Sequence, residues 1–135
     1  MATKIFVNLP VKNLQKTNDF FTRLGFSFNA QFSDDKATCM IINEDAYAML
    51  LTEEFFRGFT SKPLADAHQS TEVLVALSAE SRAGVDDMVN KALAAGGSEA
   101  REPKDHDFMY IRCFNDPDGH MWEVFWMDPA AVNPQ

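Results

Sequence analysis

The sequence predicts an α+β fold made of two modules with the same layout, each a strand, a helix and three further strands. Two observations lead to this prediction. An alternating strand-like stretch followed by a helical stretch that ends in glycine occurs twice, once up to Gly25 and once up to Gly96-Gly97. Each copy is followed by three short apolar stretches separated by polar turn residues. The copies share a pattern rather than a sequence, and a duplicated unit is the simplest account of them.

Size and composition indicate one domain over residues 1–135. The chain has 135 residues, 46% of them hydrophobic, and no apolar run of the length that crosses a bilayer or forms a signal peptide. Cys39 and Cys113 lie in strand-like stretches, which favours buried free thiols and a cytoplasmic protein. The net charge of −8 argues against nucleic acid or a membrane surface as a partner, and it allows a cationic small ligand.

The first module is expected over residues 4–57. The alternation in Lys4–Leu9 predicts a strand that Pro10 ends. Asn13 is a suitable N-cap for the following helix, and Gly25 suits a left-handed residue after its last turn. Three strands should complete the module, over Phe26–Gln31, Ala37–Ile42 and Ala46–Leu51. The stretch Thr52–Ser70 predicts a short helical turn and a connector, and its phenylalanines either cover a pocket or pack on the core.

The second module is expected over residues 71–127. Its predicted elements are a strand, a helix and three strands, over Thr71–Ser78, Ser81–Ala95, Ser98–Arg101, Phe108–Asn115 and His120–Met127. The tetrapeptide Asp116-Pro117-Asp118-Gly119 is a strong turn signal. If these four residues form the loop, Arg112 lies directly opposite Glu123, and the two should form an ion pair. The tail from Asp128 is expected to be frayed.

In such a module the helix covers one face of the sheet and leaves the other face open. Alternation places Ile5, Val7 and Leu9 under the first helix and the odd-numbered residues of Val73–Leu77 under the second. The two modules are expected to form a partly open eight-stranded sheet around a concave pocket that suits a small molecule. The residues expected to line this pocket are Phe6, Asn8, Met49, Glu72, Leu74, Tyr110, Arg112 and Glu123.

Two stretches carry a resemblance to a known family. KIFVNLPVKNLQKTNDFFTRLGF, residues 4–26, and NDPDGHMWEVFW, residues 115–126, resemble the vicinal oxygen chelate superfamily. That superfamily includes glyoxalase I, the bleomycin-resistance proteins and the extradiol dioxygenases. The resemblance covers essentially the whole chain and is more specific for the fold than for the reaction. It also implies a homodimer, because many members complete their sites across a two-fold interface.

The resemblance implies four metal-ligand positions, which fall on Phe6, Met49, Leu74 and Glu123. Of these, only Glu123 can coordinate a hard or borderline metal ion, so we expect no resident metal or other cofactor. A register error of two residues would bring Asn8 or Glu72 into the set and leaves a divalent-metal site conceivable. Glu123 is also the candidate catalytic residue if the protein is an enzyme.

Three classes of function stay open. The first is a metal-free protein that binds a small molecule, similar to the bleomycin-resistance proteins. The second is a metal-dependent enzyme that uses Glu123, similar to lactoylglutathione lyase or a dioxygenase. The third is a non-enzymatic interaction module. Among the histidines, His120 is expected to brace the turn or lie on the surface, His106 to lie in a solvated loop, and His68 to lie in the connector.

Overall fold

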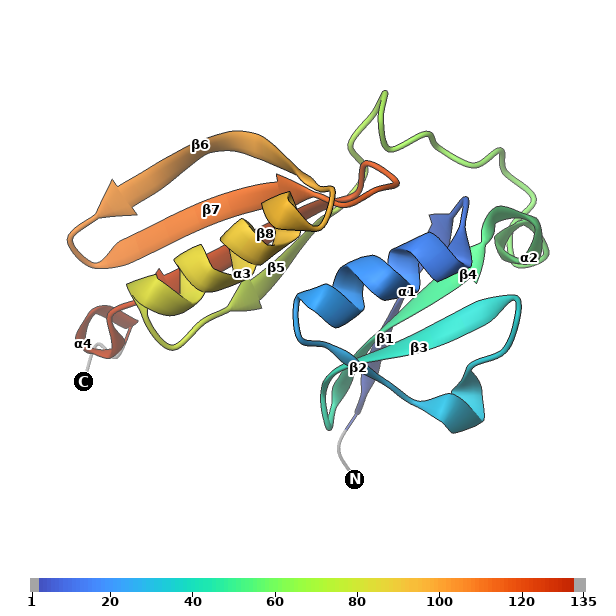
Figure 1. Cartoon of the computed structure of the whole chain (residues 1–135), viewed down its shortest axis with the longest axis horizontal. Coiled ribbons are helices and arrows are strands. Elements are labelled where there is room, and N and C mark those ends of the chain that lie inside the picture. Colours follow the sequence, from blue (N-terminus) through green and yellow to red (C-terminus); the bar gives the residue numbers. More distant parts are fainter. Residues whose placement is uncertain (1–2, 133–135) are drawn as a thin grey trace. The chain divides into compact units, whose positions relative to one another are not determined.

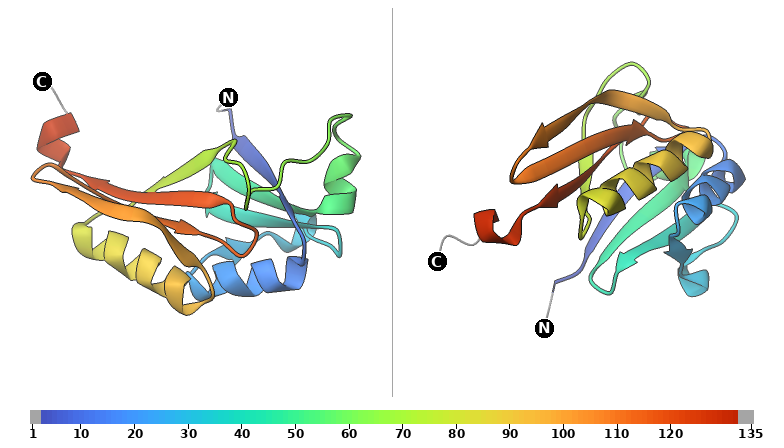
Figure 2. Two further views of the ribbon diagram at one scale, coloured as in Figure 1. Left: turned by 90° about the horizontal axis from the view of Figure 1, so that it is seen from above. Right: turned by 60° about the vertical axis from the view of Figure 1, so that its left-hand side comes forward.

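The computed structural model describes residues 3–132, and its chain divides into two compact units, Met1–Ala65 and Asp66–Gln135. Each unit contains one four-stranded sheet with a helix along one of its faces (Figures 1 and 2). The predicted α+β fold with two similar βαβββ modules is therefore confirmed, as two separate and unclosed four-stranded sheets.

Unit 1 contains β1 (Ile5–Val11), α1 (Leu14–Arg23), β2 (Ser27–Phe28), the 3₁₀ turn η1 (Ala30–Phe32), β3 (Ala37–Asn43), β4 (Ala46–Thr52) and α2 (Glu53–Arg57). The strand order is β1-β4-β3-β2, with β1 parallel to β4 and the other pairs antiparallel. As predicted, Asn13 caps α1 by accepting the Lys16 N–H at 3.0 Å, and Gly25 has a φ of +102°.

The core of unit 1 lies between α1 and the sheet. The fully buried side chains of α1 include Phe20 and Phe21, and those of the strands include Val11, Met40 and Leu50. Because side chains alternate along a strand, the opposite face of this sheet carries Phe6, Asn8, Tyr47 and Met49. Burial of the α1 side of the sheet therefore fixes which residues the open face presents.

Unit 2 contains β5 (Leu74–Ser78), α3 (Arg82–Ala94), β6 (Ser98–His106), β7 (Met109–Asn115), β8 (Met121–Met127) and the short helix α4 (Pro129–Val132). The order β5-β8-β7-β6 repeats the layout of unit 1, with β5 parallel to β8. Val85 and Val89 of α3 pack in the core with Phe114, Trp122 and Val124, and the parallel rings of Phe114 and Trp122 lie 6.3 Å apart.

Several predicted boundaries are wrong for identifiable reasons. Pro10 does not end β1, because β1 is an edge strand of its sheet, where proline is tolerated. The strand expected over Phe26–Gln31 shortens to Ser27–Phe28, since Asn29 caps a 3₁₀ turn by accepting the Gln31 N–H. β6 continues past Arg101 to His106, and part of the expected frayed tail forms α4.

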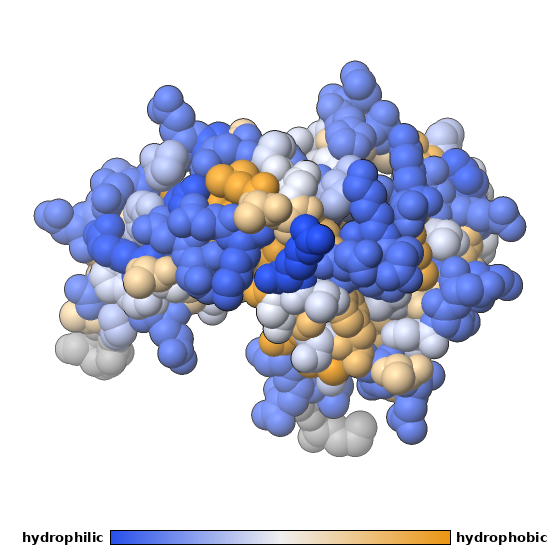
Figure 3. Space-filling view, in the orientation of Figure 1, coloured by the Kyte–Doolittle hydropathy of each residue, from blue (hydrophilic) through white to orange (hydrophobic). Residues whose placement is uncertain are grey.

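Apolar side chains remain exposed on both units. Figure 3 shows a largely hydrophilic surface in which separate groups of hydrophobic residues are visible. The large exposed apolar residues are Ile5, Phe6, Phe32, Phe55, Phe59, Val73, Leu74 and Phe108. None of the helices within residues 3–132 is long and apolar enough to cross a membrane.

Candidate functional site

The open face of the unit 2 sheet carries an ion pair between Arg101 of β6 and Glu123 of β8. Arg101 Nη1 lies 3.1 Å from Glu123 Oε2, and the two side chains are 31% and 19% exposed. Cys113 of β7 lies between them and pairs in register with Arg101 on one side and with Glu123 on the other. Leu74 of β5 pairs with Met121, two residues before Glu123, so it lies on the same face. A partly buried charge pair thus sits among apolar side chains.

The predicted Arg112–Glu123 pair is wrong. Arg112 pairs in register with Val124, and Cys113 is the residue opposite Glu123. The connection between β7 and β8 contains five residues rather than four, because Asp116 binds His120 into the turn. The Asp116 N–H donates to the His120 carbonyl at 2.9 Å, and Asp116 Oδ1 accepts the His120 N–H at 3.0 Å. One added turn residue moves Arg112 to the opposite face of the sheet from Glu123.

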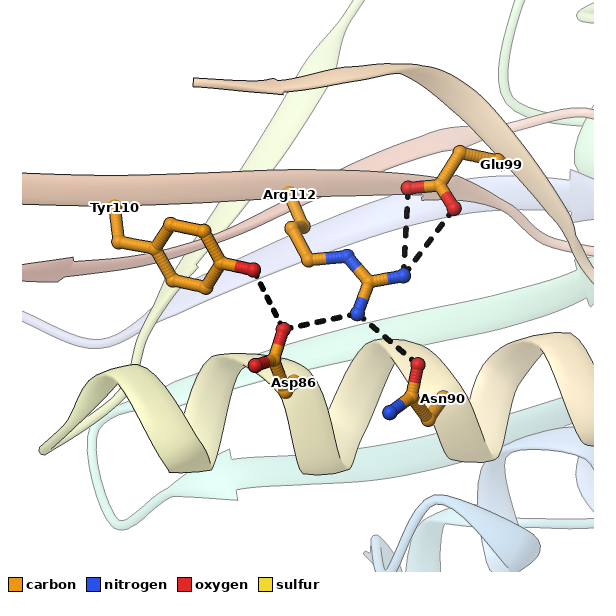
Figure 4. A network of polar contacts seen from close by, with 5 residues as sticks. All are labelled: Asp86, Asn90, Glu99, Tyr110 and Arg112. Atoms are coloured by element: carbon orange, nitrogen blue, oxygen red, sulfur yellow. Dashed lines mark hydrogen bonds and ion pairs between the residues drawn. The ribbon is translucent and has the colours of Figure 1, made fainter. Parts of the chain in front are cut away.

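Arg112 instead lies between the sheet and α3, at the centre of a polar network (Figure 4). Its Nη1 donates to Asp86 Oδ1 and Asn90 Oδ1, each at 3.0 Å, and its Nη2 donates to Glu99 Oε1 at 3.2 Å. The Tyr110 hydroxyl donates to Asp86 Oδ1 at 2.6 Å. Tyr110 and Arg112 therefore face α3, and their predicted place on the open face is corrected.

The network shifts the pKa values of Asp86 and Arg112 in the directions that keep both side chains charged. The hydrogen bond from Tyr110 and the neighbouring Arg112 hold the pKa of Asp86 below its ordinary value. The same bond to Asp86 raises the pKa of Tyr110. Burial by itself lowers the pKa of Arg112, but its bonds to Glu99 and Asp86 more than offset this and raise it. A guanidinium held in this way is well suited to joining a helix to a sheet.

The turn that closes the β7–β8 hairpin is centred on the buried carboxylate of Asp116. Its Oδ1 accepts the N–H groups of Asp118 and His120, and its Oδ2 accepts the indole N–H of Trp122 at 3.0 Å. Burial raises the pKa of this carboxyl. His120 is buried and is part of the turn, as the turn-bracing prediction required. The backbone of His68 lies against Gly119, where an added Cβ would come within 2.9 Å of His68 N.

The open face of the unit 1 sheet is aromatic and apolar. The rings of Phe6 and Tyr47 stack with centroids 4.7 Å apart, and Lys4 Nζ lies 5.9 Å from the Tyr47 centroid. Met49 of β4 is half-buried on the same face, and Asn8 donates its side-chain amide to the Phe6 carbonyl at 3.2 Å. This face offers apolar surface with few polar groups.

The side chains at the four expected metal positions do not form a ligand set. Phe6 and Leu74 have no donor atoms, Met49 offers only a thioether, and the carboxylate of Glu123 is paired with Arg101. Glu72 lies before β5 and is exposed. In the part of the chain from residue 3 to residue 132, no three His, Cys, Asp or Glu side chains gather closely enough to hold a metal ion. Within the described residues, the four expected positions do not supply a donor set for a divalent metal.

Three further predictions concern the cysteines, His106 and the phenylalanines that follow β4. Cys39 and Cys113 are buried free thiols, as predicted, and burial raises the pKa of both. His106, which was expected in a solvated loop, ends β6 and stacks on Phe108 with ring centroids 5.8 Å apart. The phenylalanines predicted to cover a pocket or pack on the core line a pocket in unit 1 through Phe55 and Phe59.

Sequence reasoning missed Arg101, and the local pairing explains why. A two-residue turn at Asp107-Phe108 would place Arg101 opposite Phe114, on the face that α3 covers. Irregularities in β6 between Glu99 and Arg101 and between Arg101 and Lys104 shift the register, so Arg101 pairs with Cys113. A β-bulge of this kind changes the face of a side chain and has no dependable signature in a single sequence.

The layout and sequence of the chain establish its family. The family model for the Glyoxalase/Bleomycin resistance protein/Dioxygenase superfamily matches residues 5–124. The chain belongs to this superfamily, and the predicted resemblance is confirmed. No curated protein sequence matches the chain significantly.

Solved structures agree with this assignment. A hypothetical protein from S. aureus is 28% identical, with a TM-score of 0.78 over 93% of this chain and 95% of that one. A glyoxalase-related enzyme from Fulvimarina pelagi is 16% identical, with a TM-score of 0.79 over 93% and 88% of the two chains. A fosfomycin resistance protein from Listeria monocytogenes, solved with Mn(II) and a sulfate ion, is 17% identical, with a TM-score of 0.68 over 96% and 93%. The last two comparisons support the fold alone.

Proposed function

We propose that this protein binds a small organic molecule without a resident metal ion, as a non-catalytic member of its superfamily. The observation that supports the proposal most directly is the Arg101–Glu123 ion pair, because Glu123 is the one residue among the four expected ligand positions that can coordinate a hard or borderline metal ion. The guanidinium of Arg101 supplies the positive charge that a metal ion would otherwise place beside this carboxylate. The pair is partly buried, so it stays close to apolar surface that a ligand can cover.

The open faces favour a ligand with a flat apolar part. On unit 1 the stacked rings of Phe6 and Tyr47 offer such a surface, and the Tyr47 ring already lies near the ammonium of Lys4. On unit 2 Leu74 is exposed on the face that holds Glu123. The net charge of −8 is compatible with a cationic ligand. Arg101, by contrast, is able to bind an anionic group. A ligand screen should therefore include both cationic and anionic compounds.

The first test is the metal content of the protein purified without a chelator or histidine tag, followed by calorimetric titration with zinc, nickel, manganese and iron(II). We expect less than about a tenth of an equivalent of metal and no binding heat, because a single paired carboxylate is a poor ligand set. Near-stoichiometric metal would contradict the proposal. It would favour the lyase-like or dioxygenase-like alternative that uses Glu123.

The second test is a thermal-shift screen of planar cations and planar anions on the wild type and on Glu123→Gln and Arg101→Gln. A ligand of the open face should stabilise the wild type, and one of these two substitutions should remove most of that shift. Glu102→Gln is the matched control, since Glu102 is exposed on the same strand as Arg101. A ligand that stabilises all four proteins equally binds elsewhere and would not support the proposed site.

A further inference from the structure

A separate pocket of about 510 Å³ lies at the end of the unit 1 sheet where β3 begins, β4 ends and α2 follows. Its lining residues are Lys36, Thr52, Glu54, Phe55, Gly58 and Phe59. Thr52 pairs in register with Val11, whose side chain is buried on the face covered by α1. The pocket is therefore not part of the open face that carries Phe6 and Met49, and it does not involve Arg101 or Glu123.

One wall of the pocket is aromatic. The rings of Phe55 and Phe59 meet edge to face with centroids 5.2 Å apart. They are 36% and 71% exposed, so both keep apolar surface in contact with water. Covering such surface with an apolar group of a ligand is favourable, since aromatic side chains offer a large apolar area.

The polar groups of the pocket are one cation, one anion and one hydroxyl. Lys36 and Glu54 are exposed, and neither forms an ion pair with any residue in the described range 3–132. The neighbouring Glu53, by contrast, lies 4.0 Å from Arg57. Thr52 Oγ1 accepts the Phe55 N–H at 3.3 Å, which leaves its hydroxyl hydrogen available to an acceptor.

We propose that this pocket binds a small zwitterion with an apolar side chain, the chemistry of a free aromatic or branched α-amino acid. The ammonium of Lys36 faces the carboxylate of such a ligand, the carboxylate of Glu54 faces its ammonium, and the phenylalanine rings cover its side chain. A ligand with only one charge can form only one of these two ion contacts, so it should bind more weakly than the zwitterion. The pocket volume lies within the usual range for small-molecule sites.

The proposal is tested by NMR titration of the ¹⁵N-labelled protein with L-phenylalanine, phenylpropionate and phenethylamine. The three probes share the phenyl group and differ in charge. A ligand of this size is expected to bind with a dissociation constant of about 1 mM. Since Lys36 and Glu54 are exposed, each charge contact should contribute about a fivefold preference for the zwitterion. Chemical shift changes should concentrate on residues 52–59.

Three substitutions and three matched controls separate the pocket from general surface binding. Lys36→Met should abolish the preference for L-phenylalanine over phenethylamine, and Glu54→Gln the preference over phenylpropionate. Phe59→Ala should weaken all three probes. The controls Lys62→Met, Glu53→Gln and Phe32→Ala change residues outside the lining, two of them exposed and Glu53 half-buried, and should leave binding unchanged. Absence of saturable binding, equal affinity for the three probes, or equal effects of pocket and control substitutions would each overturn the proposal.

Discussion

Single carboxylates of this chain differ in function because their neighbours differ. Asp86 lies on α3, receives hydrogen bonds from Tyr110 and Arg112, and is 46% exposed. Asp87, the next residue, is 63% exposed and forms an ion pair with Lys91, one turn away. The first carboxylate helps to join α3 to the sheet, while the second belongs to an exposed pair of the kind that adds little stability.

The substitution Asp86→Asn should make this difference measurable as a function of pH. The pKa of Asp86 is lowered in the folded protein from an ordinary value of 3.8. Its stabilising effect is therefore fully present above pH 3.8 and is lost as the pH falls through the lowered pKa. We expect the free energy of unfolding in urea to fall by about 1 kcal/mol at pH 7 in Asp86→Asn, after allowance for partial exposure.

The difference between the wild type and Asp86→Asn should shrink below pH 3.8 and stay constant between pH 5 and 7. Asp87→Asn is the control and should cost no more than about 0.5 kcal/mol at pH 7. Equal losses in the two variants at neutral pH would show that the Arg112 network does not stabilise the fold.

At the scale of elements, the turn between β7 and β8 fixes the arrangement of the site. Asp116 organises five residues, and this loop length decides which side chains of β7 face α3. Gly119 has a φ of +84°, and a Cβ at this position would come within 2.8 Å of His68 Nδ1 and 2.9 Å of His68 N. The connector around His68 therefore packs against the turn, and any side chain at Gly119 displaces it.

Gly119→Ala and Gly96→Ala separate backbone strain from this contact. Gly96 lies in the same unit with a φ of +108°, and an added Cβ there meets nothing within 4 Å. We expect Gly96→Ala to lower the free energy of unfolding by about 1 kcal/mol. Gly119→Ala should lower it by at least about 1 kcal/mol more, because the backbone of His68 must move. Urea unfolding measures both changes. Equal losses would mean that moving the connector around His68 does not lower the free energy of unfolding.

Local signals made most elements predictable from the sequence. Asn13 caps its helix and Gly25 and Gly96 end theirs, because each of these effects depends only on near neighbours. Alternation correctly placed Leu9 and Leu77 under the helices, whereas Ile5 and Val73, predicted on the same faces, are 58% and 40% exposed. These parts of the fold need no information from distant segments.

Register across long strands was not predictable, and the candidate site depends on it. A four-residue loop would place Arg112 and Tyr110 on the open face, whereas the buried Asp116 adds His120 to the turn and places them on the other face. Arg101 was missed because two irregularities in β6 shift its pairing. A shift of one residue reverses the face of every following side chain, so small errors in loop length exchange site residues for core residues.

At the scale of the whole molecule, each sheet ends in an edge strand that exposes apolar side chains. β1 and β5 each have one hydrogen-bonded neighbour in their own sheet. Ile5 and Phe6 of β1 are 58% and 48% exposed, and Leu74 of β5 is 45% exposed. Exposed apolar edge strands are templates for pairing with further chain, and natural proteins generally cover or blunt them.

We therefore expect a homodimer in which a second copy of the chain covers apolar surface at these edges. Sedimentation equilibrium of the wild type should give twice the mass of 15.2 kDa. Ile5→Asp and Leu74→Asp should shift the equilibrium toward the monomer, because a charge is costly to bury in an apolar interface. Phe32→Asp is the control, since Phe32 is 63% exposed but belongs to η1 and not to an edge strand. A wild type that stays monomeric up to about 100 μM, well above typical dimer dissociation constants, would contradict the expectation, and a dimer that resists both edge substitutions would place the interface on another surface.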